Sequence, residues 1–179
     1  MTSTNTSTDL TSPANEDDYK EGSLSAPIVL VEYGDYQCPY CAQAVGVVQE
    51  LQNELGEQLC YIFRYFPLVQ MHPRAIAAAR AAESAAAQGQ FWQMHYELFS
   101  NQDNFGDDDL LSYAGNLDLD VDKFKQDLES KKTEQRIQTD IQTGDESGIQ
   151  GTPAFFINGA YHRGSWMLDD MRTALKAIL

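Results

Sequence analysis

The motif Cys38-Pro39-Tyr40-Cys41 constrains the fold most, because it lies between an apolar run and a helical pattern. Residues 28–33 form a continuous, β-branched run bounded by proline and glycine, which predicts a buried strand. Residues 42–55 predict a helix that ends at a glycine. Pro39 then falls at the first helical position, where its missing N–H costs nothing. We therefore expect a strand, a Cys-x-x-Cys motif and a helix in direct succession.

The two cysteines of this motif are expected to differ in acidity. Cys38 falls at the helix N-terminus, where unpaired N–H groups and the macrodipole favour a thiolate. Cys41 lies one turn deeper, which suits a resolving thiol. The alternative is half of a zinc site, which needs two more ligands. Cys60 stands alone within a predicted strand, where we expect an inert buried thiol. The three histidines lack metal-ligand spacing, so no metal is expected. No cofactor is expected either.

The rest of the chain predicts a mixed α/β fold. A second strand over residues 58–65 completes a βαβ unit, which implies parallel pairing and a right-handed crossover. A long helical stretch over about residues 73–147 follows. The chain then returns to a strand at residues 154–157, and Asn158-Gly159 is a strong hairpin signal before a short strand and a final helix. The predicted order is βαβ, helical insertion, ββα.

Length and charge limit the function further. The 179 residues suit one domain, and the net charge of −15 argues against nucleic acid or an anionic membrane as a partner. No apolar run reaches the length of a transmembrane helix. The acidic part of the insertion is interpreted as a solvated face or as a docking surface for a basic partner.

The first 25 residues are rich in Ser, Thr, Asn and acids. They lack the basic start and apolar core of a secretory signal, so we expect a disordered tail over residues 1–25 and a folded domain over residues 26–179. If Met1 is the natural start, a cytoplasmic protein is expected, although a tethering linker left after processing would have a similar composition.

Four motifs of the chain carry a resemblance to a known family. They are residues 31–41 (VEYGDYQCPYC), 63–68 (FRYFPL), 91–95 (FWQMH) and 148–159 (GIQGTPAFFING). Together they resemble the DsbA-like thiol–disulfide oxidoreductases. The resemblance implies a thioredoxin-like fold in which a helical insertion interrupts the domain.

The resemblance assigns roles to residues outside the Cys-x-x-Cys motif. Glu32 lies inside an apolar strand, where an acid is costly unless it has a role or lies at an exposed strand end. The resemblance implies a buried acid that takes the proton from Cys41. It also implies a cis bond between Thr152 and Pro153, packed against the cysteine pair. The Thr152 backbone would then pair with an extended substrate segment.

Other polar and aromatic residues are further candidates for contact with the substrate or the core. Pro39 and Tyr40 are expected to contact substrate along with Thr152 and Pro153, and Tyr40 either tunes the redox poise or is a plain surface aromatic. His95 is expected to pack between the insertion and the core. The sequence does not decide whether two further residues border the active-site face, namely Arg64 and His72.

Two classes of function compete. The first is an enzyme in which Cys38 is the nucleophile and Cys41 resolves the mixed disulfide, with protein thiols or disulfides as substrates and a partner that resets the dithiol. The second is a peptide-binding or redox-sensing module without turnover. A glutathione-dependent enzyme of a related fold would usually lack the second cysteine. A monomer is expected, and the direction of electron flow is left open.

Overall fold

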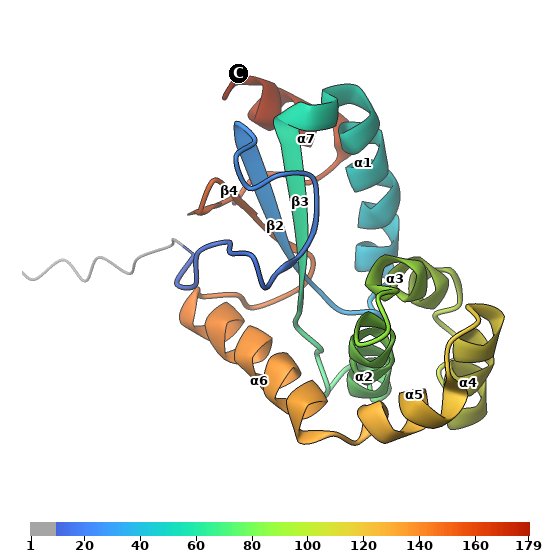
Figure 1. Ribbon diagram of the computed structural model, residues 1–179. Helices are drawn as coiled ribbons and strands as arrows, with labels where there is room; N and C mark the ends of the chain where they lie inside the picture. The colour runs from blue at the N-terminus through green and yellow to red at the C-terminus, as the bar shows by residue number, and fades with distance from the viewer. Residues whose placement is uncertain (1–9) are drawn as a thin grey trace, which may run out of the picture.

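The computed structural model describes residues 10–179 and has a central sheet flanked by helices (Figure 1). The five strands lie in the order β1-β3-β2-β4-β5. They are β1 (Tyr19–Glu21), β2 (Ile28–Gly34), β3 (Leu59–Tyr65), β4 (Ala154–Ile157) and β5 (Ala160–Tyr161). The helices are α1 (Pro39–Leu55), α2 (Ala75–Ala86), α3 (Phe91–Ser100), α4 (Asp107–Asn116), α5 (Val121–Leu128), α6 (Lys131–Glu146) and α7 (Leu168–Lys176).

The predicted order of elements is confirmed. Strands β2 and β3 pair in parallel across α1, as a βαβ unit requires. Strand β4 runs antiparallel to β2, and β5 turns back along β4 after Asn158 and Gly159, which both have positive φ. The returning strand is shorter than expected, because it ends at Tyr161.

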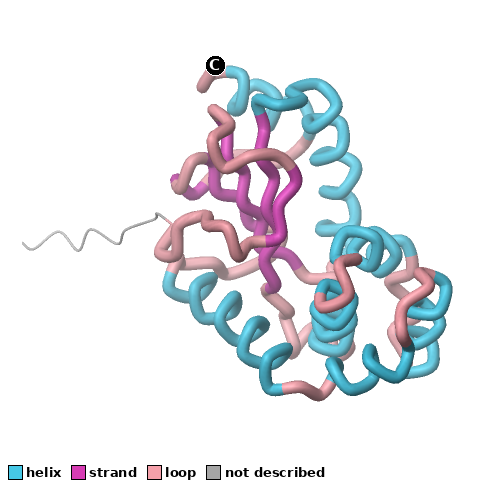
Figure 2. The backbone as a smooth tube through the Cα atoms, viewed as in Figure 1, coloured by secondary structure: helices cyan, strands magenta, loops and turns pink. Residues whose placement is uncertain are grey.

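Other segments of the chain flank both faces of the sheet (Figure 2). Helices α1 and α7 cover one face, where the larger apolar cluster includes Leu30 and Phe63. The N-terminal segment and α6 cover the other face, where a smaller cluster includes Val31 and Phe156. Neighbouring residues of β2 thus belong to opposite clusters, which explains why its sequence, apart from Glu32, is continuously apolar rather than alternating.

Helices α2 to α6 form the insertion between β3 and β4. Helix α2 is central to it and packs against α3, α5 and α6. Its small alanine side chains let neighbouring helices approach closely, and four of them are fully buried: Ala78, Ala81, Ala82 and Ala85. The helical insertion lies at one end of the sheet, the end at which β2 gives way to the Cys-x-x-Cys motif (Figure 1).

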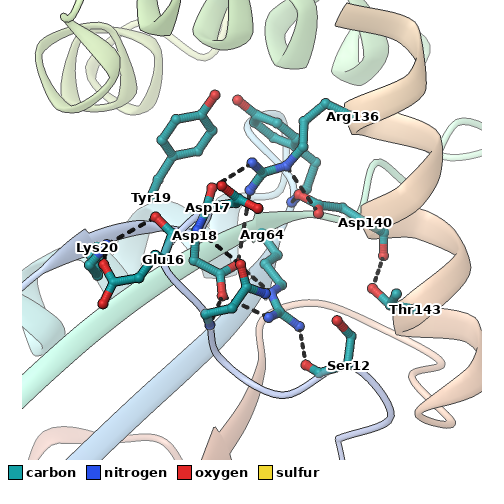
Figure 3. A network of polar contacts seen from close by, with 12 residues as sticks. Ser12, Glu16, Asp17, Asp18, Tyr19, Lys20, Arg64, Arg136, Asp140 and Thr143 are labelled. Atoms are coloured by element: carbon teal, nitrogen blue, oxygen red, sulfur yellow. Dashed lines mark hydrogen bonds and ion pairs between the residues drawn. The ribbon is translucent and has the colours of Figure 1, made fainter. Parts of the chain in front are cut away.

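The predicted disorder of residues 1–25 is wrong for residues 10–25, whereas residues 1–9 lie outside the described part of the chain. Residues 19–21 form β1, which pairs antiparallel with β3. The guanidinium of Arg64, 2% exposed, donates through Nε and Nη2 to Asp18 at 2.8 Å and through Nη1 to the Ser12 carbonyl at 2.7 Å (Figure 3). A buried arginine on β3 therefore holds the N-terminal segment in place. The polar composition of that segment gave no indication of this contact.

Candidate active site

The Cys-x-x-Cys motif lies where β2 passes into α1. Cys38 is the N-cap of α1, with an extended backbone (φ −76°, ψ 121°), and Pro39 follows within the first turn as predicted. Cys41 lies one turn inside the helix and is fully buried, while Cys38 is 4% exposed. Both are free thiols. One cysteine is therefore presented at the helix end and the other is enclosed behind it.

The two thiols differ sharply in acidity. A hydrogen bond from the Cys41 thiol is the main cause that lowers the pKa of Cys38 to about 5, and contacts with Thr152 and with backbone N–H groups add to it against the effect of burial. Burial is the main cause that raises the pKa of Cys41 well above its ordinary value. Cys38 is thus a thiolate at neutral pH and Cys41 holds its proton.

Glu32 lies on β2 behind the cysteine pair and is 2% exposed. Its Oε2 accepts a hydrogen bond of 2.6 Å from the Tyr61 hydroxyl. Burial raises the pKa of Glu32 to about 8, the Tyr61 hydrogen bond opposes this shift, and the charge on Cys38 adds to it. A buried acid that can gain or lose a proton near neutral pH therefore stands beside the dithiol.

Thr152 and Pro153 lie beside Cys38. Their peptide bond is cis, as the resemblance implied. The Cys38 thiol lies 3.6 Å from the Thr152 carbonyl oxygen, and β4 begins directly after Pro153. The structure thus brings Cys38, Cys41, Thr152 and Pro153 together, whereas Tyr40 points outward and is 60% exposed.

Two residues of the site were missed at the sequence level. The first is Asp35, which is 1% exposed in the turn before Cys38 and whose carboxylate contacts His72 Nδ1 at 2.7 Å. The second is Gln102, whose Nε2 donates to the Tyr36 carbonyl at 2.9 Å and to the Cys38 carbonyl at 2.8 Å. An acid at the end of a buried strand was a signal for Asp35, but nothing in the sequence pointed to Gln102.

Of the remaining candidates, only His72 borders the active site. His95 is buried, bonds through Nδ1 to the Tyr36 hydroxyl at 3.0 Å, and its pKa is lowered by burial to about 3, so it is neutral and packs as expected. Arg64 anchors the N-terminal segment and does not border the active site, whereas His72 does through Asp35. Cys60 is buried in the smaller cluster, on the other face of the sheet.

No group of three or more His, Cys, Asp or Glu residues within residues 10–179 could hold a metal ion. None of the helices in this part of the chain is long and apolar enough to cross a membrane.

Solved structures share this fold. A thioredoxin-like oxidoreductase from Silicibacter pomeroyi superimposes with a TM-score of 0.80 at 24% identity, covering 91% of this chain and 92% of that one. BdbD from Bacillus subtilis gives 0.79 at 21% identity, covering 90% and 92%. The α-DsbA1 protein from Wolbachia pipientis gives 0.79 at 24% identity, covering 96% and 95%.

Curated relatives are more similar in sequence but much longer. The protein named Na(+)/H(+) antiporter NhaA 1 from Mycobacterium sp. (strain KMS) is 43% identical over 164 residues, which are 90% of this chain and 27% of that protein. A protein of the same name from Salinispora arenicola is 42% identical over 93% of this chain and 26% of its own length. This chain thus spans about a quarter of these relatives. A family model described as thioredoxin matches residues 14–177, and the chain therefore belongs to the thioredoxin family.

Proposed function

We propose that this chain is a thiol–disulfide oxidoreductase that acts on protein thiols and disulfides through Cys38 and Cys41. One observation carries the proposal: the two thiols are neighbours of opposite acidity. Cys38 is held as a thiolate at a helix N-terminus, and Cys41 is buried and protonated behind it. A nucleophile paired with a resolving thiol needs this asymmetry.

In the reducing direction, the Cys38 thiolate attacks one sulfur of a substrate disulfide. A mixed disulfide forms and the first substrate thiolate leaves. Cys41 then loses its proton and attacks Cys38 Sγ, which forms the Cys38–Cys41 disulfide and releases the second substrate thiolate. In the oxidising direction the same steps run backwards, and a redox partner resets the dithiol in either case.

Glu32 supplies the proton transfer of the resolving step in this proposal. With a pKa of about 8, Glu32 is mostly protonated at neutral pH, and its minor ionised form accepts the Cys41 proton. The charge of this ionised form interacts with both cysteines. Its second carboxyl oxygen, Oε1, has no hydrogen-bond partner among the described residues and is free to take up that proton.

The substrate in this proposal is an extended protein segment. The Thr152 carbonyl lies beside Cys38 and offers a backbone acceptor, so that a segment can be held without regard to its side chains. Exposed Pro39 and Tyr40 border the same face. All these residues come from one chain, and a monomer is sufficient for the reaction.

The test is a redox titration of the purified protein in glutathione buffers, with free thiols counted by alkylation and mass. We expect a reversible transition confined to Cys38 and Cys41. A midpoint of about −120 mV would make the protein an oxidant and one of about −270 mV a reductase, by comparison with known oxidoreductases. If the two thiols never form a disulfide, the proposal fails and a binding module becomes the better interpretation.

A further inference from the structure

Asp35 stands between the cysteines and the segment that follows β3. Its Oδ1 accepts a hydrogen bond of 2.7 Å from the Gln37 backbone N–H. Its Oδ2 accepts one of 2.8 Å from the Leu68 backbone N–H and lies 2.7 Å from His72 Nδ1. A carboxylate only accepts hydrogen bonds, so the proton of this contact lies on His72 Nδ1. Three donors from two parts of the chain thus fix one buried carboxylate.

The backbone of the same residue points at the resolving thiol. The Asp35 N–H donates to Cys41 Sγ at 3.5 Å. Because the side chain of Asp35 is held on both oxygens, its backbone has little freedom to turn this N–H away from the sulfur. An N–H group aimed at sulfur stabilises the thiolate more than the thiol.

From this arrangement we propose that Asp35 is a positioning residue for Cys41. Fixed by His72 and by the Leu68 N–H, it keeps its own N–H on Cys41 Sγ and so favours the Cys41 thiolate during resolution. The inference rests on the proposed function, because it concerns the second step of that reaction. In this step the Cys41 proton leaves, the Cys41–Cys38 bond forms, and the bond between Cys38 and the substrate sulfur breaks with both electrons on the departing thiolate.

The groups around Cys41 oppose its ionisation, which gives this N–H its importance. Burial is the largest cause that raises the pKa of Cys41, and the neighbouring Cys38 and Glu32 raise it further. The Asp35 N–H acts in the opposite direction. The pKa of Cys38 does not depend on the Asp35 N–H in this way, because it is lowered mainly by the hydrogen bond from the Cys41 thiol.

The experiment follows both cysteines in one reaction. An aromatic disulfide with a coloured thiolate, dithiobis-nitrobenzoate, is added to the reduced full-length protein. Attack by Cys38 releases one coloured thiolate, and attack by Cys41 on the mixed disulfide releases a second. The variants are His72→Ala and Asp35→Asn, the first of which removes only a partly exposed side chain. Asp18→Ala is the matched control, because it breaks a buried ion pair remote from the dithiol.

We expect the second release to slow about threefold or more in both variants. Each unit by which the Cys41 pKa rises leaves about tenfold less thiolate, which its higher nucleophilicity offsets about threefold. The midpoint of the second release should also move to higher pH, while the first release keeps its rate and pH dependence. In the Asp18→Ala control, both releases should keep the rate and pH dependence of the wild type.

Two results would overturn the inference: a second release as fast as that of the wild type in both variants, or an equal slowing of both phases. The second of these would mean a general loosening of the site. Failure of the proposed function looks different, because the wild-type protein itself would then release one coloured thiolate or none.

Discussion

The Tyr61 hydroxyl on β3 donates a 2.6 Å hydrogen bond to one carboxyl oxygen of Glu32 on β2. The other oxygen has no hydrogen-bond partner among the described residues. One side of the carboxyl group is thus fixed in orientation and the other is left for proton exchange. This buried acid makes the stability of the fold depend on pH.

Glu32→Gln should flatten that dependence. The pKa of Glu32 is about 8 in the folded protein against an ordinary 4.5. Its contribution to stability is therefore fully present below pH 4.5 and is lost as the pH rises through about 8. At about 1.4 kcal/mol per pKa unit, the loss amounts to several kcal/mol. Urea unfolding of the reduced protein at several pH values measures it.

Glutamine does not titrate, so the free energy of unfolding of Glu32→Gln should increase relative to that of the wild type as the pH rises. Tyr61→Phe is the control, since it keeps the acid and removes the hydrogen bond that lowers its pKa. Its stability should fall with pH at least as strongly as that of the wild type. Parallel curves for the wild type and Glu32→Gln would contradict the buried titration.

Alkylation of Cys38 should be half-maximal at about pH 5, because its pKa is lowered to that value mainly by the Cys41 thiol. Cys41→Ala removes this donor and should move the midpoint to higher pH. Rates of iodoacetamide modification, read by mass, test this. Cys60→Ala removes a buried thiol on the other face and should leave the Cys38 curve in place; an unmoved Cys41→Ala curve would argue against the role of the Cys41 thiol.

Gln102→Ala should loosen the turn that carries Cys38. It removes two hydrogen bonds to backbone carbonyls of that turn and should cost about 1–2 kcal/mol of stability. Hydrogen exchange should speed up in residues 35–41. Gln90→Ala is matched, because it removes a 3.0 Å bond to the Leu117 carbonyl within the insertion. Equal exchange in the two variants would show that the insertion does not hold the turn.

Arg64→Met should destabilise the protein by about 3–5 kcal/mol, because it leaves the buried Asp18 carboxylate with the Arg136 guanidinium at 4.0 Å in place of the Arg64 contact at 2.8 Å. The double variant with Asp18→Asn should recover part of this loss. Denaturant unfolding measures both. The dithiol midpoint potential should stay unchanged, and a shifted potential would mean that the N-terminal segment influences the active site.

The fold was predictable because its signals are local. The strand before Cys38, the helix stopped by Gly56 and the hairpin at Asn158-Gly159 each follow from short-range patterns, and the structure has all of them. The N-terminal segment was not predictable in this way. Its order comes from Arg64 and β3, which lie some 40 residues or more away along the chain, whereas composition reports only its own polarity.

The residues of the site also differ in how far local sequence patterns predict them. Cys38 and Cys41 could be read from spacing and helix position, and Thr152 and Pro153 from the resemblance. For Asp35 the sequence offered only an acid at the end of a buried strand, and for Gln102 it offered nothing, because the importance of both lies in contacts between segments that only folding brings together.

The two outermost strands are very short, three residues in β1 and two in β5. They flank the longer β3 and β4 on opposite sides of the sheet. A long, flat outer strand would present a row of open N–H and C=O groups to any unfolded chain nearby. This protein is proposed to bind extended segments of other proteins, which could pair with such an edge. Its short outer strands offer few open N–H and C=O groups for pairing, which favours release of the partner over coaggregation.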